Sequence, residues 1–478
     1  MKIVIEGGDC LTFCENLSLI FFPGERFPLD GTDESRREAA VFISESDGGV
    51  FSSVTLRDGE RSARGVGDAS GNDKKAVKLS VGSAFFDAGV KLTGKRPPWG
   101  VLTGVRPSKI PFSLYEGGLG DGEVLKILTE DYLLTPEKAE LLTDVCAAQK
   151  GIRELAAEDT CSLYVSIPFC PTRCAYCSFV SYSTPRHLSL IPEYIEALIP
   201  EIRCKADSAH ENGKKIISVY VGGGTPTVLD ARQLDRLLSA VNGATENDPV
   251  SEFTVEAGRP DTVDAEKFRV MRSHGVDRTS VNPQILDDGV LRGIGRRHTV
   301  EDFYRAYSEA KNAGFGTVNT DLIAGLPGSD RKLFADTLEK TIALRPENVT
   351  VHTFCVKRSS EISDAARSGA GVGAETEDFF DTAGSVNDAR RSLSGAGYSP
   401  YYLYRQKNAR GNLENVGYAL PGHVGLYNVC IMEELHDIYG AGAGAVSKFR
   451  REDGRIVRDF NPKYTYEYLD RIKKESGI

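Results

Sequence analysis

The run Cys170-Pro-Thr-Arg-Cys174-Ala-Tyr-Cys177 places three cysteines at CxxxCxxC spacing, directly after the apolar segment Leu163–Ile167. The apolar segment predicts a buried strand, so the three thiols share one loop at the end of that strand. Three thiolates can hold three irons of a [4Fe–4S] cluster and leave the fourth iron open to a small molecule, whereas an electron-transfer cluster takes four cysteines. The trio at Cys170, Cys174 and Cys177 therefore favours chemistry at an open iron.

The same cysteines have alternative interpretations. Clustered thiols can be buried small hydrophobes, disulfide partners or ligands of a zinc site. Disulfides are disfavoured, because no secretory signal precedes the loop and the other seven of the ten cysteines are scattered along the chain. Zinc would take a fourth ligand at a regular offset, but position 179 is Phe179 and no histidine lies between Cys161 and His187. Spacing alone leaves these alternatives open.

Length and composition limit the classes of protein that fit. A chain of 478 residues predicts about three domains. A hydrophobic content of 40% with 26% charged residues is typical of a soluble globular protein, and a net charge of −10 without a basic stripe argues against a nucleic-acid partner. No apolar run approaches the roughly 18–20 residues that span a bilayer, so we expect no stable membrane insertion. Unpaired cysteines and no targeting segment predict a cytoplasmic protein.

Residues 1–115 read as an N-terminal β-rich domain. Short β-branched and aromatic runs predict strands at Leu17–Phe22, Ala40–Ile43 and Val50–Leu56. The Gly- and Asp-rich stretch Gly65–Asn72 predicts an exposed loop. Residues 116–158 change to helical periodicity and predict a helical connection.

Residues 159–355 alternate apolar strand-like segments with helical stretches. The six predicted strands are Leu163–Ile167, Ile217–Val221, Phe253–Glu256, Arg278–Asn282, Thr317–Ile323 and Asn348–Phe354. Six βα units in series predict an α/β fold with a parallel sheet, open or barrel-like, whose chemistry sits where strands end. Residues 356–478 form a third block, which we expect to be a C-terminal α+β domain that covers the substrate.

A glycine run and four polar residues fall at or near these strand ends. Gly222, Gly223, Gly224 and Thr225 follow the second strand, where glycine lets the backbone approach a ligand closely, although glycines after a strand are more often a simple turn. The four polar residues are Glu256, Gln284, Arg296 and Asp321. Each alone could be a solvated or capping residue. Together they suit the hydroxyls and carboxylate of S-adenosylmethionine (SAM), the ligand of the open iron in radical SAM enzymes.

Four stretches resemble the oxygen-independent coproporphyrinogen III oxidase family of the radical SAM superfamily. They are Ser162-Leu-Tyr-Val-Ser-Ile-Pro-Phe-Cys170, Gly222-Gly-Gly-Thr-Pro-Thr227, Gly295-Arg-Arg-His-Thr299 and Asp321-Leu-Ile-Ala-Gly-Leu-Pro327. Further runs are similar to the coproporphyrinogen dehydrogenase branch that carries an extra N-terminal domain, among them Gly104–Lys109, Thr254–Pro260, Ser280–Gln284, His352–Arg358, Tyr401–Asn408 and Asn412–Tyr418. The resemblance runs from about residue 100 to 450.

The resemblance implies a partial (β/α)6 radical SAM barrel and a defined reaction. Cys170, Cys174 and Cys177 would bind the [4Fe–4S] cluster, and reductive cleavage of SAM would give a 5′-deoxyadenosyl radical. That radical would take hydrogen from a propionate of the porphyrinogen substrate, coproporphyrinogen III. Loss of CO₂ and one electron leaves a vinyl group, and two rounds yield protoporphyrinogen IX. The resemblance leaves the electron donor and the electron acceptor unidentified.

The resemblance also implies roles for single residues. SAM would be held by Gly222, Gly223, Gly224, Thr225, Glu256, Gln284, Arg296 and Asp321. Tyr164 matches a tyrosine beside the cluster and SAM, and is the candidate catalytic residue. Candidates for the carboxylates of the substrate are Arg297, Lys357, Arg358, Arg405 and Lys407, although ordinary surface charge is an equal alternative for each.

Departures from the pattern leave a second function open. The best-characterised oxidase branch has a cysteine where this chain has Phe179 and a histidine where it has Ser166. The competitor is a haem-binding chaperone of the same superfamily, without decarboxylation, which typically carries His-Asn-x-x-Tyr-Trp in its C-terminal block. This chain reads Glu414-Asn-Val-Gly-Tyr-Ala419 there, which favours the enzyme, but other histidines could ligate haem: His352, His423 or His436.

Overall fold

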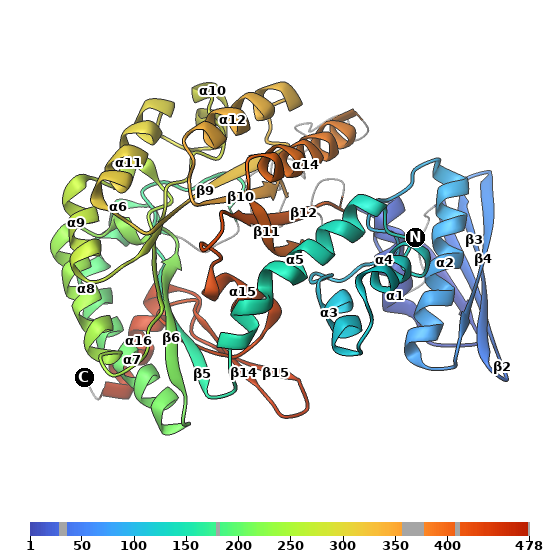
Figure 1. Cartoon of the computed structure of the whole chain (residues 1–478), viewed down its shortest axis with the longest axis horizontal. Helices are drawn as coiled ribbons and strands as arrows, with labels where there is room; N and C mark the ends of the chain where they lie inside the picture. The colour runs from blue at the N-terminus through green and yellow to red at the C-terminus, as the bar shows by residue number, and fades with distance from the viewer. Residues whose placement is uncertain (28–35, 178–181, 356–376, 407–411, 477–478) are drawn as a thin grey trace. The chain divides into compact units, whose positions relative to one another are not determined.

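The protein is described by a computed structural model that covers residues 1–27, 36–177, 182–355, 377–406 and 412–476. The chain divides into two compact units, Met1–Ala147 and Ala148–Ile478 (Figure 1). The domain boundaries expected from the sequence, at residues 115, 158 and 355, do not coincide with this division. The expected boundaries at residues 158 and 355, which fall inside the larger unit, stay a prediction.

The smaller unit is built on a four-stranded sheet in the order β1-β2-β3-β4, with β1 parallel to β2 and the other pairs antiparallel. Its elements are β1 (Lys2–Glu6), α1 (Leu11–Phe21), β2 (Arg37–Ser46), β3 (Gly49–Asp58), β4 (Arg61–Ser70), α2 (Lys74–Thr93), α3 (Lys109–Glu116) and α4 (Asp121–Glu130). Helix α5 (Pro136–Leu155) spans the boundary between the units. Asp73 caps α2 by accepting from the Ala76 N–H, and Gly94 ends it in the left-handed conformation.

The sequence predicted a β-rich unit but assigned the wrong secondary structure to two of its segments. Leu17–Phe22, expected as a strand, lies almost wholly in α1, and Gly65–Asn72, expected as a loop, lies mainly in β4. The glycines of β4 serve packing, because a Cβ on Gly65 would lie 2.1 Å from the carbonyl oxygen of Ala84 in α2. Glycine in β4 therefore lets α2 pack directly on the strand.

The larger unit contains an eleven-stranded sheet in the order β11-β12-β10-β9-β8-β7-β6-β5-β13-β14-β15. Its centre is six parallel strands: β5 (Thr160–Ile167), β6 (Lys215–Gly223), β7 (Glu252–Glu256), β8 (Arg278–Ser280), β9 (Thr317–Ala324) and β10 (Asn348–Thr353). These confirm the six predicted strands and the partial (β/α)6 barrel.

Helices alternate with the parallel strands and cover the outside of the sheet (Figure 1). They are α6 (Pro185–Leu188), α7 (Ile191–Glu211), α8 (Ala231–Ala244), α9 (Ala265–Ser273), α10 (Asp288–Gly293), α11 (Val300–Ala313), α12 (Arg331–Ala343) and α14 (Glu377–Gly395), with short 3₁₀ turns η1 (Pro226–Val228) and η2 (Pro260–Thr262). Side-chain caps begin six of these helices: Thr184, Asp230, Asp264, Asp287, Thr299 and Asp330 each accept a backbone N–H of the first turn.

The C-terminal residues extend this sheet at both edges. Their elements are β11 (Ser399–Arg405), β12 (Glu414–Ala419), α15 (Leu426–Glu433), β13 (Asp437–Ala441), β14 (Val446–Arg450), β15 (Ile456–Phe460) and α16 (Thr465–Ser476). Strand β12 pairs antiparallel with β10, and β13 pairs parallel with β5. The third block of the sequence thus shares one sheet with the barrel.

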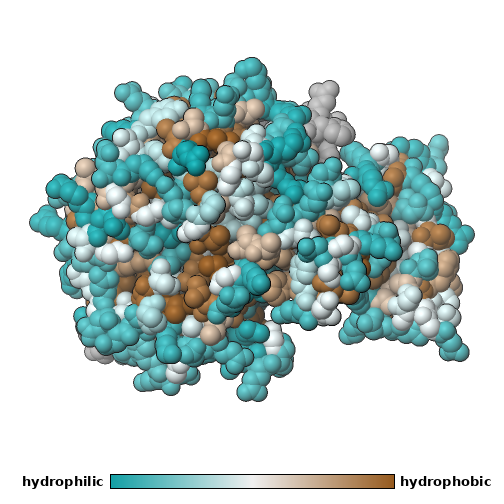
Figure 2. Space-filling view, viewed as in Figure 1, coloured by the Kyte–Doolittle hydropathy of each residue, from teal (hydrophilic) through white to brown (hydrophobic). Residues whose placement is uncertain are grey.

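Hydrophilic residues cover much of the face seen in Figure 2, with apolar residues visible between them. The apolar side of the parallel strands is buried against the surrounding helices, as for Val165, Val219 and Val255, none of which is exposed. In the part of the chain that the structure describes, no helix is both long enough and apolar enough to cross a membrane.

The packing of α2 on β4 makes a testable prediction. A Cβ on Gly67 would lie 2.2 Å from the carbonyl oxygen of Ser80, so Gly67→Ala should lower the free energy of unfolding of the smaller unit by about 1–3 kcal/mol. The chain has one tryptophan, Trp99, buried in this unit, so its fluorescence during urea denaturation reports on this unit.

Gly122→Ala is the matched control. Gly122 lies in α4 of the same unit, and a Cβ at this position would meet no atom within 4 Å, so alanine there should be neutral or stabilise by up to about 1 kcal/mol. Equal effects of the two substitutions would contradict the packing argument.

Candidate active site

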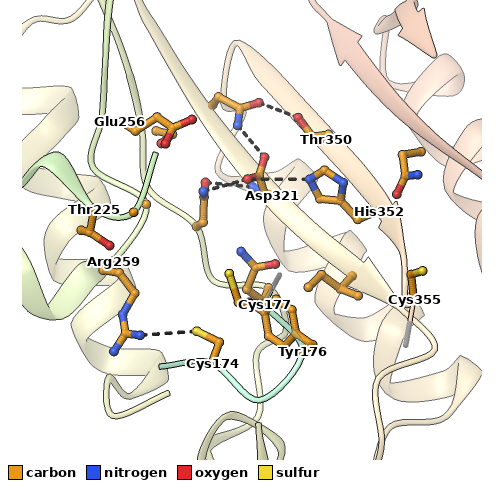
Figure 3. A pocket seen from close by; sticks show the side chains of 18 of the residues that line it. Cys174, Tyr176, Cys177, Thr225, Glu256, Arg259, Asp321, Thr350, His352 and Cys355 are labelled. Atoms are coloured by element: carbon orange, nitrogen blue, oxygen red, sulfur yellow. Dashed lines mark hydrogen bonds and ion pairs between the residues drawn. The ribbon is translucent and has the colours of Figure 1, made fainter. Parts of the chain in front are cut away.

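A cavity of about 390 Å³ opens where the parallel strands of the larger unit end (Figure 3). We call it the barrel cavity. Its walls are the cysteine loop after β5, the glycine run after β6, residues in or just beyond β7, β8, β9 and β10, and residues of β11 and β12. Active sites of parallel α/β barrels lie at this end of the strands. The sequence-predicted residues that line it are Cys170, Cys174, Cys177, Gly223, Gly224, Thr225, Glu256, Gln284, Arg296 and Asp321.

The three cysteines lie on one wall of the barrel cavity. None of them forms a disulfide, and each side chain is partly exposed. Cys170 Sγ lies 3.3 Å from Thr225 Oγ1, and the Ala175 N–H donates to the Ile294 carbonyl at 3.0 Å. The loop that carries the thiols is thus held on two sides, by the glycine run and by the segment before Arg296.

The glycine run lies against the segment that enters the cysteine loop. The Gly224 N–H donates to the Ile167 carbonyl at 2.8 Å, and the Thr225 N–H donates to the Phe169 carbonyl at 2.7 Å. A Cβ on Gly224 would lie 2.5 Å from that Phe169 oxygen, so only glycine allows this approach. Gly222 lies just behind the wall, where a Cβ would come within 3.2 Å of the Glu256 carboxyl group.

Glu256, at the end of β7, accepts a hydrogen bond from the Tyr220 hydroxyl at 2.5 Å. Burial raises the pKa of Glu256 to about 7, the Tyr220 bond lowers it in part, and the charge of Asp321 raises it further. Tyr164, the predicted catalytic residue, does not line the barrel cavity. Its ring stacks on Tyr220 with centroids 6.3 Å apart, and both rings stack on Tyr427. Tyr164 therefore contacts a residue that lines the cavity, Tyr220, but does not line the cavity itself.

Asp321, in β9, is held by side-chain amides. Asn319 Nδ2 donates to its Oδ1 at 2.7 Å, Asn282 Nδ2 donates to its Oδ2 at 2.8 Å, and His352 Nε2 lies 3.8 Å from Oδ2 (Figure 3). Burial raises the pKa of Asp321, but the contact with His352 and the other hydrogen bonds outweigh burial and hold that pKa below its ordinary value. Asp321 is therefore a preorganised carboxylate.

Gln284 and Arg296 carry buried polar atoms that lack protein partners. Gln284 has a positive φ of 65°, and its side-chain Oε1 is buried without a hydrogen-bond donor. Arg296 is 6% exposed; its Nη1 donates to the carbonyl of Asn282 at 2.8 Å, and its buried Nε has no acceptor. Orphaned buried donors and acceptors are costly, so this pair suits a polar ligand that arrives from outside the chain.

The structure gives two residues a place in the cavity that sequence reasoning did not predict: Arg259 had no expected role, and His352 was named only as a possible haem ligand. Arg259 and His352 line the barrel cavity, and both lie in runs that supported the family resemblance. Their position just after β7 and in β10 was the signal that could have found them.

Of the five residues expected to meet substrate carboxylates, the two that the structure describes do not line the cavity. Arg297 is exposed and does not line the cavity. Arg405 is 3% exposed, donates to the Asn412 carbonyl, and likewise does not line it. Lys357, Arg358 and Lys407 lie outside the described residues, as does Phe179.

The residues present fit a [4Fe–4S] cluster with SAM better than a single metal ion. Within the described ranges, no three His, Cys, Asp or Glu side chains are placed to hold one ion. A cluster binds each thiolate to a different iron, so its thiolates stand apart, and three thiols on one wall suit it. The orphaned Arg296 Nε suits a ligand carboxylate, and the orphaned Gln284 Oε1 suits an N–H or O–H donor of the same ligand, which the glycine run lets approach closely.

The raised pKa of Glu256 predicts a pH dependence of stability. The ordinary value is 4.5 and the folded value about 7, so the neutral carboxyl contributes stability that is present below about pH 4.5 and lost as pH rises through 7. Between pH 5 and 8 the unfolding free energy of cluster-free Glu256→Gln should therefore fall by roughly 2–3 kcal/mol less than that of the wild type. Urea denaturation at the two pH values measures this difference.

Glu211→Gln, at an exposed site near the end of α7, is the control and should leave the pH dependence of the wild type unchanged. If Glu256→Gln behaved like this control, Glu256 would not be a buried, neutral carboxyl.

Known proteins resemble this chain in sequence and fold. The Radical SAM superfamily matches residues 164–341. Over 403 residues, which cover 84% of this chain and 79% of the relative, the chain is 38% identical to the oxygen-independent coproporphyrinogen-III oxidase-like protein HemZ of Bacillus subtilis. It is 28% identical over 315 residues to the heme chaperone HemW of Escherichia coli, covering 66% of this chain and 77% of that protein.

The fold also matches a solved structure. Coproporphyrinogen III oxidase (HemN) from Escherichia coli aligns with a TM-score of 0.52 and 23% identity, over 68% of this chain and 73% of that one. The match supports the mixed α/β architecture with its central parallel sheet. The chain therefore belongs to the radical SAM superfamily, which uses a [4Fe–4S] cluster and SAM, and within it to the oxygen-independent coproporphyrinogen-III oxidase-like family.

Proposed function

We propose that this protein is an oxygen-independent coproporphyrinogen III oxidase of haem biosynthesis. It converts coproporphyrinogen III to protoporphyrinogen IX by two oxidative decarboxylations and acts in the cytoplasm, where its ten cysteines, none in a disulfide, stay reduced. Similarity to HemZ over most of both chains supports this reaction class.

One observation carries the proposal. The barrel cavity joins three thiols on one wall to a buried amide oxygen and a buried guanidinium nitrogen that have no protein partner. Cys170, Cys174 and Cys177 would hold the cluster. When bound, cluster and SAM supply a radical that abstracts hydrogen from the substrate. A site with only structural cysteines has no need for orphaned polar atoms beside them.

The SAM-facing residues have separate tasks. Arg296 would pair with the SAM carboxylate, because a guanidinium fork matches that group and its Nε is unsatisfied. Glu256 and Asp321 would accept from the ribose hydroxyls and the amino group. The backbone of Gly223 and Gly224 would approach the ligand where a Cβ would block it. These carboxylates are preorganised by Tyr220 and by the amides of Asn282 and Asn319.

The wall formed by β10, β11 and β12 is the proposed substrate side. His352, Tyr404, Gln406 and Asn415 line the cavity there, and His352 lies across it from Cys174 (Figure 3). The Tyr404 hydroxyl lies 3.4 Å from His352 Nδ1. Their polar groups can donate to a propionate and orient it toward the cluster wall.

The haem-chaperone alternative requires a histidine that can ligate haem. At the position of the chaperone histidine this chain has Glu414, 1% exposed in β12. Of the remaining candidates, His423 is bonded to Thr317 and His436 to Ser162, and neither lines the cavity. His352 does line it, so His352 is the candidate haem ligand among these three histidines.

The proposal predicts product formation that depends on the cysteine loop. Reconstituted protein, incubated anaerobically with SAM, a reductant and coproporphyrinogen III, should form protoporphyrinogen IX, detected as protoporphyrin after oxidation. Cys174→Ala should reduce this product and the cluster absorbance to background, because one iron loses its ligand. Cys204→Ala, at an exposed cysteine of α7, is the matched control and should retain both.

A haem titration separates the two functions. Stoichiometric haem binding that is lost in His352→Ala, together with SAM cleavage but no protoporphyrin in the wild type, would replace the oxidase assignment by the chaperone. The oxidase assignment predicts no such haem site, and a reduced rate of product formation in His352→Ala.

A further inference from the structure

Arg259 is a buried cation with a fixed orientation. It follows β7, is 3% exposed and lines the barrel cavity. Its Nε donates to Asp261 Oδ1 at 3.0 Å and its Nη2 donates to Oδ2 at 3.0 Å. Such a two-bond fork fixes the plane of the guanidinium more firmly than a single contact would.

The other edge of the same guanidinium meets the cysteine loop. Nη2 donates to Thr172 Oγ1 at 2.8 Å, and Nη1 lies 3.5 Å from both the Thr172 carbonyl oxygen and Cys174 Sγ (Figure 3). The Thr172 hydroxyl in turn donates to the Gly295 carbonyl at 3.1 Å. Arg259 thus joins the turn after β7 to the residue two positions before Cys174 and to the thiol itself.

Arg296 is a second buried cation that also lies beside Cys174, but its other contacts differ from those of Arg259. The Arg296 guanidinium donates to the carbonyls of Asn282 and Gly258 and keeps an unsatisfied Nε, which suits an incoming ligand. Arg259 forms a salt bridge with Asp261 and has no orphaned nitrogen among the described contacts. Its remaining N–H bonds point at the loop rather than at an empty position.

The contact between Arg259 and Cys174 would affect the reduction potential of a bound cluster. Hydrogen bonds to the sulfurs and nearby charge set the reduction potential of an Fe–S cluster. Reduction adds negative charge, so an N–H donor aimed at a cysteine sulfur stabilises the reduced state more than the oxidised state. The Asp261 carboxylate offsets part of the positive charge and keeps the fork in place.

We propose that Arg259 is a positioning residue that fixes Cys174 and raises the reduction potential of the cluster, with Asp261 as its anchor and partial counter-charge. The inference rests on the proposed function, because it takes Cys170, Cys174 and Cys177 as the cluster ligands. It goes beyond that function by assigning control of the redox step to a residue outside the SAM-binding set.

The test is the midpoint potential of the reconstituted cluster, from a redox titration followed by electron paramagnetic resonance without SAM, with iron and sulfide content measured on each sample. Arg259→Gln should keep its iron but disfavour reduction roughly tenfold, which is a midpoint about 59 mV more negative. Arg259→Lys keeps the charge without the fork and should fall between Arg259→Gln and the wild type. Asp261→Asn removes the counter-charge and should move the midpoint in the positive direction.

Arg305→Gln is the matched control. Arg305 donates to the carbonyls of Pro260 and Val263, and so supports the same turn without a contact to the cysteine loop. Its midpoint should equal that of the wild type.

The outcomes separate this inference from the function on which it rests. Unchanged midpoints in both Arg259 variants, or equal shifts in Arg305→Gln, would overturn the role of Arg259. If both Arg259 variants lost their iron, a negative or absent shift in Asp261→Asn would overturn it. A wild type that binds no cluster, or a Cys174→Ala variant that keeps one, would overturn the proposed function itself.

Discussion

The barrel cavity depends on two backbone hydrogen bonds between the end of β5 and the glycine run after β6. The Gly224 N–H donates to the Ile167 carbonyl and the Thr225 N–H donates to the Phe169 carbonyl, which continues the pairing of β5 with β6 beyond the last paired residues. Because a Cβ on Gly224 would lie 2.5 Å from the Phe169 oxygen, this contact tolerates glycine alone. The position of Cys170, and with it the cysteine wall, follows from that contact.

Burial of polar groups around this wall explains why the site favours an incoming ligand. Arg259 and Arg296 are both nearly inaccessible, yet only Arg259 has a carboxylate partner among the described residues. Asp321 is held charged by amides and His352, while burial raises the pKa of Glu256 to about 7, so that this carboxyl is only partly ionised at pH 7. Isolated buried charges and orphaned donors are unfavourable, so a zwitterionic ligand with hydroxyl groups would satisfy what the chain itself leaves open.

Sequence alone could predict the barrel because its information is local. The near-continuous apolar runs of the six parallel strands and the polar residues at their ends follow from periodicity and spacing, and the structure brings Glu256, Gln284, Arg296 and Asp321 to one cavity. The sequence predictions failed where contacts between distant segments of the chain decide the structure. Gly65 reads as loop because its role is to admit α2, and the exposure of Arg297 or burial of Arg405 depends on neighbours far along the chain. The contact of Arg259 with Cys174 joins residues 85 positions apart, which no local pattern reports.

The central claim is that the cysteine trio holds a cluster with one iron open to SAM. Low-temperature electron paramagnetic resonance of the reduced protein, recorded with and without SAM, tests it directly. The account predicts the signal of a reduced [4Fe–4S] cluster that changes when SAM is added, because the ligand binds the open iron. A signal that stays the same at saturating SAM, or the absence of a cluster signal after reconstitution, would contradict it.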